Sequence, residues 1–306
     1  MTAVQEGVLL VDKPEGPTSH DVVAVARRAL GEKRIGHAGT LDPLATGLLV
    51  LMVGRATRLA ALLSGVDKTY RGVVRLGLAT DTYDRDGEPD GPPREVRIDR
   101  ETLLPHLEPF RGTILQTPPP FSAKKVHGTP MYRLARNRRP VTPVPTPVTF
   151  KRLELLALDG ADLTIEAEVS AGTYLRSFAH DLGRALGCGA HLHSLRRLHA
   201  GPFDVEAALP LAELQALGRD AAARLLPLHE IPLGMPTLRL SPSGVMAVRH
   251  GRPCTPADVV TPPLPLPPGR CRLQGPEGGL VAIAEVVLSG RQGPFPMIRP
   301  QIVFTR

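Results

Sequence analysis

The chain has 306 residues with 42% hydrophobic content, which is enough to bury a sizeable core in roughly one to three domains. No apolar run approaches the ~20 residues of a membrane span, and the N-terminus carries Glu6 but no Lys or Arg before Lys13, unlike a signal peptide. Three cysteines without zinc-site spacing and a net charge of +7 favour a cytoplasmic protein with reduced thiols, no metal and a polyanionic partner.

The first fifty residues predict strands and a helix around a glycine-rich loop. Residues 7–12 form a short apolar strand. Thr18 and Asp21 form a pattern like a capping box at the start of a helix, and Gly31 ends that helix. The apolar run 48–53 predicts a buried strand.

The middle of the chain predicts further elements and one conspicuous polar stretch at 80–87. The elements are helices at 57–64 and 99–108, strands at 70–76, 149–157 and 161–169, and a helix that opens at 172–173. Strands and helices do not alternate strictly. The pattern therefore favours an α+β fold with a mixed or antiparallel central sheet flanked by helices.

Residues 114–149 are rich in proline, and we expect them to form a surface excursion rather than core. Cations without any acid fill the part between 123 and 139; they are Lys124, Lys125, Arg133, Arg136, Arg138 and Arg139. A solvated charged face would explain such a run. Phe121 and Tyr132 lie among the cations, which favours a loop that contacts RNA.

The composition changes again after 227–236, a segment that reads as a linker. Residues 237–306 hold eight Arg, no Lys and three acids, whereas the preceding residues hold 29 basic and 27 acidic groups. Short strands are expected at 271–273, 280–287 and 297–304. The proline-rich segment 261–268 predicts an extended spacer.

The most informative segment is 36–49, with the sequence GHAGTLDPLATGLL. Its three glycines allow positive φ angles, and Pro43 restricts the backbone of Asp42. Asp42 should therefore lie on a rigid loop anchored by a buried strand, which suits a catalytic group. Taken alone, Asp42 reads more often as a turn residue and His37 as a hydrogen-bonded loop histidine.

The whole string closely resembles the catalytic motif of the pseudouridine synthases of the TruB type, which isomerise a uridine in the TΨC arm of tRNA. The resemblance implies that Asp42 is the essential catalytic carboxylate. Asp42 could act as a nucleophile or withdraw a proton, and the residues leave both roles open. The resemblance also implies a target nucleotide flipped out of its stack, with no cofactor.

Other motifs in the same order resemble further segments of this family and imply substrate-binding residues. Tyr70, in DKTYR, is similar to the tyrosine that stacks on the target base. Tyr174 and Arg176, in GTYLR, are similar to the tyrosine that contacts substrate and the arginine that pairs with the aspartate. His37 is similar to the histidine that fills the space left by the flipped nucleotide, and Leu195 to the leucine that lines the uracil pocket.

The resemblance also implies a domain organisation. The segment from Phe121 to Arg136 resembles an insertion that closes over the T-arm, which implies RNA-backbone contacts for Lys124, Lys125, Arg133 and Arg136. Residues 240–252 and 283–285 look like parts of a PUA domain, a small β-rich RNA-binding module. We therefore expect a catalytic domain at 1–228, with an RNA-binding insertion at about 114–149, and a PUA-like domain at 237–306.

The resemblance predicts a stand-alone monomer that converts uridine 55 of tRNA to pseudouridine, with no guide RNA or obligate protein partner. One alternative is the guide-RNA-dependent subunit of box H/ACA particles, which shares the GTLDP core. Another is an RNA-binding or RNA-folding protein whose catalysis is incidental. A glycoside hydrolase would need a second carboxylate about 5–10 Å from Asp42, and no second acid accompanies it in the motifs.

Overall fold

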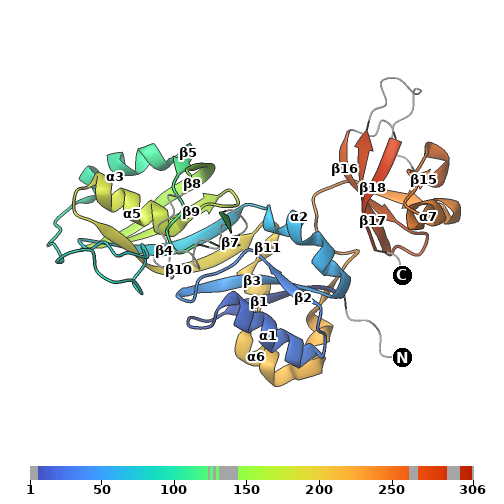
Figure 1. Ribbon diagram of the computed structural model, residues 1–306, viewed down its shortest axis with the longest axis horizontal. Coiled ribbons are helices and arrows are strands. Elements are labelled where there is room, and N and C mark those ends of the chain that lie inside the picture. Colours follow the sequence, from blue (N-terminus) through green and yellow to red (C-terminus); the bar gives the residue numbers. More distant parts are fainter. Residues whose placement is uncertain are drawn as a thin grey trace.

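The computed structural model describes residues 6–122, 125–126, 129–130, 144–261, 268–287 and 297–304. These residues form two separate sheets, a large one with helices packed around it and a small one built from the last part of the chain (Figure 1). A two-stranded ribbon joins β6 (Lys125–Val126) to β7 (Thr129–Pro130). No helix in the part of the chain that the structure describes is long and apolar enough to span a membrane.

The large sheet has eleven strands, eight of which follow one path across it. In order these are β12 (Leu209–Pro210), β1 (Gly7–Lys13), β3 (Ala45–Val53), β10 (Ala190–Ala200), β4 (Lys68–Leu76), β9 (Asp162–Val169), β8 (Thr146–Asp159) and β5 (Gly112–Gln116). Strands β2 (Ile35–Ala38), β11 (Phe203–Asp204) and β13 (Leu226–Pro227) pair at its margins. Within this sheet the pairs β1–β12 and β3–β10 are parallel and the other pairs are antiparallel, which confirms the expected mixed sheet.

Helices cover this sheet at several places (Figure 1). They are α1 (Ser19–Leu30), α2 (Ala60–Ser64), α3 (Arg100–Leu107), α5 (Leu175–Ala185) and α6 (Leu211–Leu217). The capping box of Thr18 and Asp21 is present, and Gly31 ends α1 in the left-handed conformation, as predicted. The helix expected at 57–64 is a 3-10 helix over Gly54–Leu59 that continues into α2.

Strand β3 is buried on both faces, which explains its unbroken apolar sequence. Alternate side chains enter two different clusters of buried residues. Leu49 and Leu51 pack with α1 and α5, whereas Leu48 and Val50 pack beneath α2. The loop that precedes β3 is therefore attached to one of the most buried strands of the molecule.

The small sheet has the strand order β15 (Val259–Thr261), β14 (Thr237–Leu240), β16 (Gly269–Gln274), β17 (Leu280–Val287) and β18 (Met297–Val303), with α7 (Pro242–Arg249) beside it. It has its own buried cluster. Phe304 and Ile283, however, pack in the cluster beneath α2. Arg55 and Arg58 donate hydrogen bonds to the carbonyls of Phe304 and Val303, so the two sheets are joined by apolar and polar contacts.

Three sequence predictions differ from the structure. The ends of the expected surface excursion 114–149 belong to β5 and β8, because these two strands pair with each other at the edge of the large sheet. The expected linker 227–236 buries Leu228 and Ile231 in the cluster beneath α2. The sequence interpretation also missed several elements, including the central strand β10 as well as β2, α6, β14, α7 and β15. The proline-rich residues 262–267 and the basic residues 131–143 lie outside the described residues.

We expect Gly47→Ala to lower the free energy of unfolding by at least about 2 kcal/mol. Gly47 has a φ of +95°, and a Cβ there would lie 2.3 Å from the carbonyl oxygen of Arg197 on β10. Urea unfolding would measure the change. The matched control is Gly36→Ala, whose Cβ would meet nothing closer than 3.8 Å. Equal stability of the two variants would contradict the close approach of β3 and β10.

Candidate active site

The loop that carries Asp42 is fixed on both sides of this residue. Ser19 Oγ on α1 donates to the Leu41 carbonyl at 3.0 Å and accepts from the Leu41 N–H at 2.8 Å. Lys13 Nζ at the end of β1 donates to the carbonyl of Pro43 at 3.2 Å. The rigid loop expected from the glycine and proline pattern is therefore held by side-chain contacts from two other elements.

Lys13 lies fully buried beneath this loop. Its ammonium also donates to the carbonyls of Pro14 at 2.9 Å and Pro17 at 2.8 Å. Burial lowers the pKa of Lys13 to about 8, although the charge of Asp42 opposes this lowering. Lys13 thus joins the segment after β1 to the loop of Asp42.

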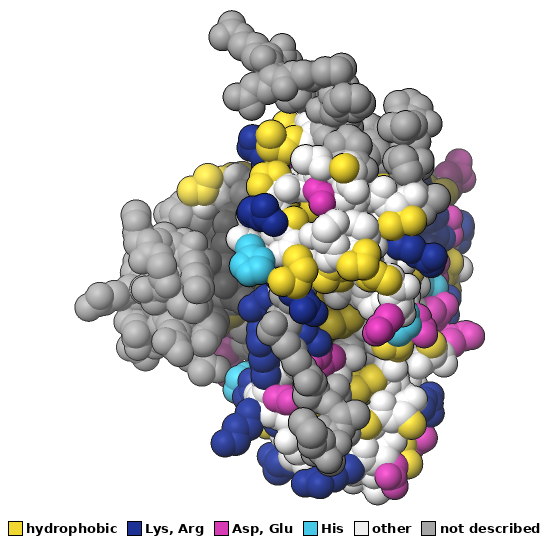
Figure 2. Space-filling model, turned by 90° about the vertical axis from the view of Figure 1, so that its right-hand side faces the viewer, with side chains coloured by type: hydrophobic (Ala, Val, Ile, Leu, Met, Phe, Trp, Pro, Cys, Tyr) yellow, Lys and Arg dark blue, Asp and Glu magenta, His cyan; other side chains and the backbone are white. Residues whose placement is uncertain are grey.

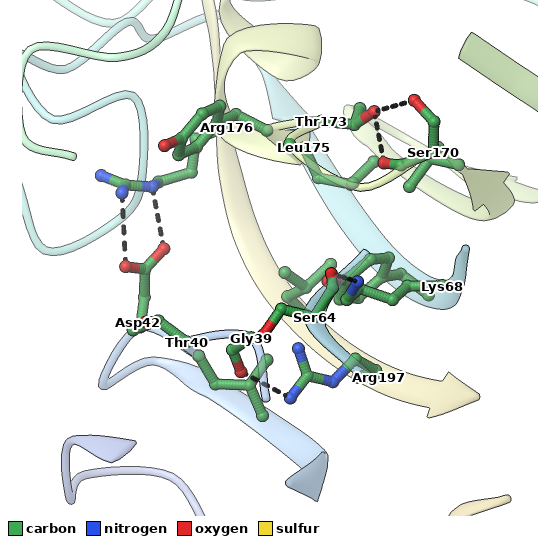
Figure 3. Close-up of a pocket in the computed structure, with 16 residues that line it drawn as sticks. Gly39, Thr40, Asp42, Ser64, Lys68, Ser170, Thr173, Leu175, Arg176 and Arg197 are labelled. Atoms are coloured by element: carbon green, nitrogen blue, oxygen red, sulfur yellow. Dashed lines mark hydrogen bonds and ion pairs between the residues drawn. The ribbon is translucent and has the colours of Figure 1, made fainter. Parts of the chain in front are cut away.

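Arg176, in the first turn of α5, holds the Asp42 carboxylate through two contacts (Figure 3). Its Nε lies 3.0 Å from Oδ2, and its Nη2 donates to Oδ1 at 3.3 Å. The arginine side chain is 6% exposed and the aspartate side chain 39% exposed. The buried guanidinium therefore holds in place a carboxylate that still reaches solvent.

A second carboxylate, Asp84, contacts the same guanidinium. Its Oδ2 lies 3.3 Å from Arg176 Nη1, and its side chain is 7% exposed. Thr82 donates its hydroxyl to Asp84 Oδ1 at 2.6 Å. Burial raises the pKa of Asp84, whereas the Thr82 hydrogen bond and the charge of Arg176 lower it. The sequence interpretation missed Asp84; its only trace was the polar stretch 80–87.

Asp42 and Arg176 lie at a cavity of about 230 Å³. Tyr70 on β4, Leu195 on β10 and Tyr174 just before α5 also line it. Burial raises the pKa of Tyr174, so its phenol stays protonated at neutral pH. An ionised carboxylate beside aromatic and apolar side chains can attack, or take a proton from, a planar ring bound in this cavity.

The structure does not bring every expected site residue to this cavity. His37 lies on β2, where its half-buried ring has no partner for Nδ1 among the described residues, and burial lowers its pKa. It is not among the residues that line the cavity. The side chains of Lys124, Lys125, Arg133 and Arg136 lie outside the described residues.

Two cations that the sequence interpretation did not single out, Lys68 and Arg197, also line the cavity. Lys68 Nζ donates to the carbonyls of Ser64 at 2.9 Å and Val66 at 2.6 Å. Burial, with the nearby charge of Arg197, lowers the pKa of Lys68 to about 8. The sequence could have indicated these two cations, because each lies two residues from an expected site residue, Tyr70 or Leu195.

Comparisons with known proteins identify the family of this chain. Residues 27–175 match the model of the TruB family pseudouridylate synthase N-terminal domain, and residues 176–231 match that of the tRNA pseudouridylate synthase B C-terminal domain. The tRNA pseudouridine synthase B of Solibacter usitatus is 45% identical over 296 residues, which cover 94% of this chain and 98% of that protein. The enzyme of the same name from Syntrophotalea carbinolica is 39% identical, covering 96% of this chain and 97% of that protein.

Solved structures with a similar fold include a Cbf5–Nop10–Gar1 complex, with a TM-score of 0.75 and 26% identity over 99% of this chain and 86% of that chain. The archaeal box H/ACA sRNP Nop10–Cbf5 complex has a TM-score of 0.73 at 26% identity, covering 99% and 87%. The chain therefore belongs to the TruB family of pseudouridylate synthases, which makes it an isomerase.

Replacing Asp84 by Asn should slow pseudouridine formation about 10- to 100-fold at saturating substrate, with little change in substrate affinity. The amide keeps the shape of the side chain but leaves Arg176 with Asp42 as its only charged partner among the described residues, so the orientation of the pair loosens. Single-turnover kinetics would measure the effect. Asp86→Asn, two residues away with a side chain that is 59% exposed, is the control. An unchanged rate in Asp84→Asn would remove Asp84 from the site.

The stability of the wild type relative to Lys68→Met should rise with pH between about 8 and 10.5. The pKa of Lys68 in the folded chain, about 8, lies below the ordinary value of 10.5. In this range the unfolded chain binds more protons, so raising the pH favours the folded state. The difference corresponds to about 3 kcal/mol. Urea unfolding of both proteins at several pH values would measure it, and parallel pH curves would contradict the burial of the charged group.

Proposed function

We propose that this chain converts uridine to pseudouridine in tRNA, at uridine 55 of the T-loop. The observation that carries the proposal is the pairing of Asp42 with Arg176 at a cavity lined by Tyr70 and Leu195. The relatives named tRNA pseudouridine synthase B support the substrate class, since the first two are 45% and 39% identical to this chain over nearly their full length.

The reaction breaks the bond between N1 and C1′, turns the uracil ring and rejoins the ring to the sugar through C5. Asp42 supplies the ionised carboxylate, as a nucleophile or as the group that withdraws a proton, and Arg176 keeps it charged and oriented. The target nucleotide leaves its stack to reach the cavity. Tyr70 gives the ring a stacking surface, Leu195 and Tyr174 close its sides, and His37 fills the vacated position in the RNA.

A positively charged surface suits this substrate. The chain has a net charge of +7, and on the face shown in Figure 2 the Lys and Arg side chains gather on the lower and left parts, with Asp and Glu more frequent toward the right. Lys124, Lys125, Arg133 and Arg136 add contacts to the phosphates of the T-arm. Residues 1–228 act as the catalytic domain and residues 237–306 as a PUA-like RNA-binding domain of a monomer.

Dependence on a guide RNA is the second candidate, because two solved structures with a similar fold are Cbf5 complexes and one of these is an archaeal box H/ACA sRNP. Sequence identity to the relatives distinguishes the two candidates. The Cbf5 chains are 26% identical to this chain, whereas the tRNA pseudouridine synthase B of Solibacter usitatus is 45% identical. We therefore favour a stand-alone enzyme.

Release of tritium from a tRNA transcript that contains 5-tritiated uridine tests this function, because the C5 hydrogen is lost when C5 bonds to the sugar. With no guide RNA, the wild type should release about one equivalent per tRNA from position 55. Asp42→Asn should release tritium at least about a thousandfold more slowly while it still binds tRNA.

The control for this experiment is Asp159→Asn, the same change at an exposed position at the end of β8. Release that appears only when guide RNA is added would favour the guide-dependent candidate. Wild-type binding without any release would favour an RNA-folding protein. Full activity of Asp42→Asn would refute the assignment of Asp42.

A further inference from the structure

Lys68 and Arg197 form a second charged wall of the cavity, across from the pair of Asp42 and Arg176 (Figure 3). They come from the neighbouring strands β4 and β10, where Arg197 lies opposite Tyr70. Both side chains are deeply buried, since Lys68 is 7% exposed and Arg197 is 0% exposed. The cavity therefore has a carboxylate at one side and two cations at the other.

No carboxylate among the described residues forms an ion pair with either of these cations. Their hydrogen bonds go to backbone carbonyls. Arg197 donates from Nε to Leu48 at 2.6 Å and from Nη2 to Gly39 at 3.0 Å, and its Nη1 is buried with no acceptor in the described chain. A buried charge without a counter-charge lowers stability, so such a pair at a substrate cavity points to a role in binding or catalysis.

The two cations also reach the same point of the cavity wall. A Cβ added to Gly39 would lie 3.1 Å from Lys68 Cε and 3.3 Å from Arg197 Nη1. Gly39 itself lines the cavity, three residues before Asp42. A side chain at Gly39 would crowd both cations at this point of the wall, three residues before the carboxylate.

We propose that Lys68 and Arg197 form a subsite that binds a carbonyl oxygen of the flipped uracil ring and stabilises the negative charge that develops on this ring. The inference rests on the proposed function, because it takes uridine as the substrate. It assigns the two cations to the base, and Asp42 to the reacting atoms between the base and the sugar.

Such a subsite fits the chemistry of the isomerisation. When the C1′–N1 bond breaks, both electrons remain on N1, and the negative charge spreads to O2 and O4. The ring then turns about the axis through C6 and N3, which exchanges N1 with C5 and O2 with O4. C5 bonds to C1′, the C5 proton leaves and N1 gains a proton, so nothing is oxidised or reduced. Donors already aimed at a charged oxygen stabilise it strongly in a buried site.

Because the turn exchanges O2 with O4, one carbonyl oxygen takes the place of the other. The same two cations can therefore bind the ring before and after it turns. Arg197, with 0% exposure, lies too deep for a group that stays on the RNA backbone.

Lys68→Met tests this subsite, with wild-type tRNA transcript as the substrate. We expect the single-turnover rate to fall about 10- to 100-fold, because one donor to a developing charge is lost, while the dissociation constant of tRNA changes less than about twofold. Methionine keeps a similar length and removes a buried charge, so the fold should persist, as thermal unfolding would confirm. Arg197→Lys keeps the charge but not the fork of donors, and it should also slow turnover.

The control is Lys151→Met, which removes an exposed cation that pairs with Asp67, the residue before Lys68. This variant should keep the wild-type rate. If Lys68→Met also keeps it, the subsite is refuted while the proposed function stands. If the wild type itself forms no pseudouridine, the proposed function fails and the subsite fails with it.

Replacing a carbonyl oxygen of the base by sulfur distinguishes a direct contact from a purely structural role of Lys68. A tRNA with 2-thiouridine or 4-thiouridine at the target carries a weaker acceptor at one carbonyl position. The wild type should be slowed by at least one of these substitutions, and Lys68→Met should be slowed no further by the same one, as seen by chromatography of the digested tRNA. Effects that multiply would refute the contact. If Lys68→Met instead binds tRNA more weakly and with a smaller salt dependence, but reacts at the wild-type rate, Lys68 contacts a phosphate.

Discussion

The guanidinium of Arg176 is the group on which the site depends. It is buried, and its partners come from three loops, namely Asp42, Asp84 with Thr82, and the carbonyl of Phe121. A buried charge is stable only when several partners satisfy it, and each partner is in turn held in place by the charge. The Asp42 carboxylate is therefore oriented by contacts that join several loops beside the large sheet, rather than by its own loop alone.

Much of the fold and part of the site could be predicted from the sequence, because these features depend on residues that are close together in the chain. The capping box of α1 and the apolar run of β3 follow from neighbouring residues, and the motif of Asp42 identified the family. The pairing of β5 with β8 could not be predicted, because proline suggests surface and register is set by contacts between distant segments.

The missed residues of the site share this cause. Asp84 lies in an ordinary polar stretch, and Lys68 and Arg197 look like surface cations in the sequence. Only the pairing of β4 with β10 places these two cations at one cavity and buries them. Lys13 and Arg197 donate to carbonyls of the loop that carries Asp42, whereas Lys68 donates to carbonyls just before β4.

The distance along the chain between the two walls of the cavity has a consequence for synthesis on the ribosome. Asp42 and Arg176 are 134 positions apart, and Thr46 bonds the carbonyl of Leu195 across 149 positions. A nascent chain that has exposed only the motif of Asp42 has neither the guanidinium nor the β10 wall. Contacts of such long range slow folding. An unfinished polypeptide that ends before α5 therefore cannot contain the complete cavity.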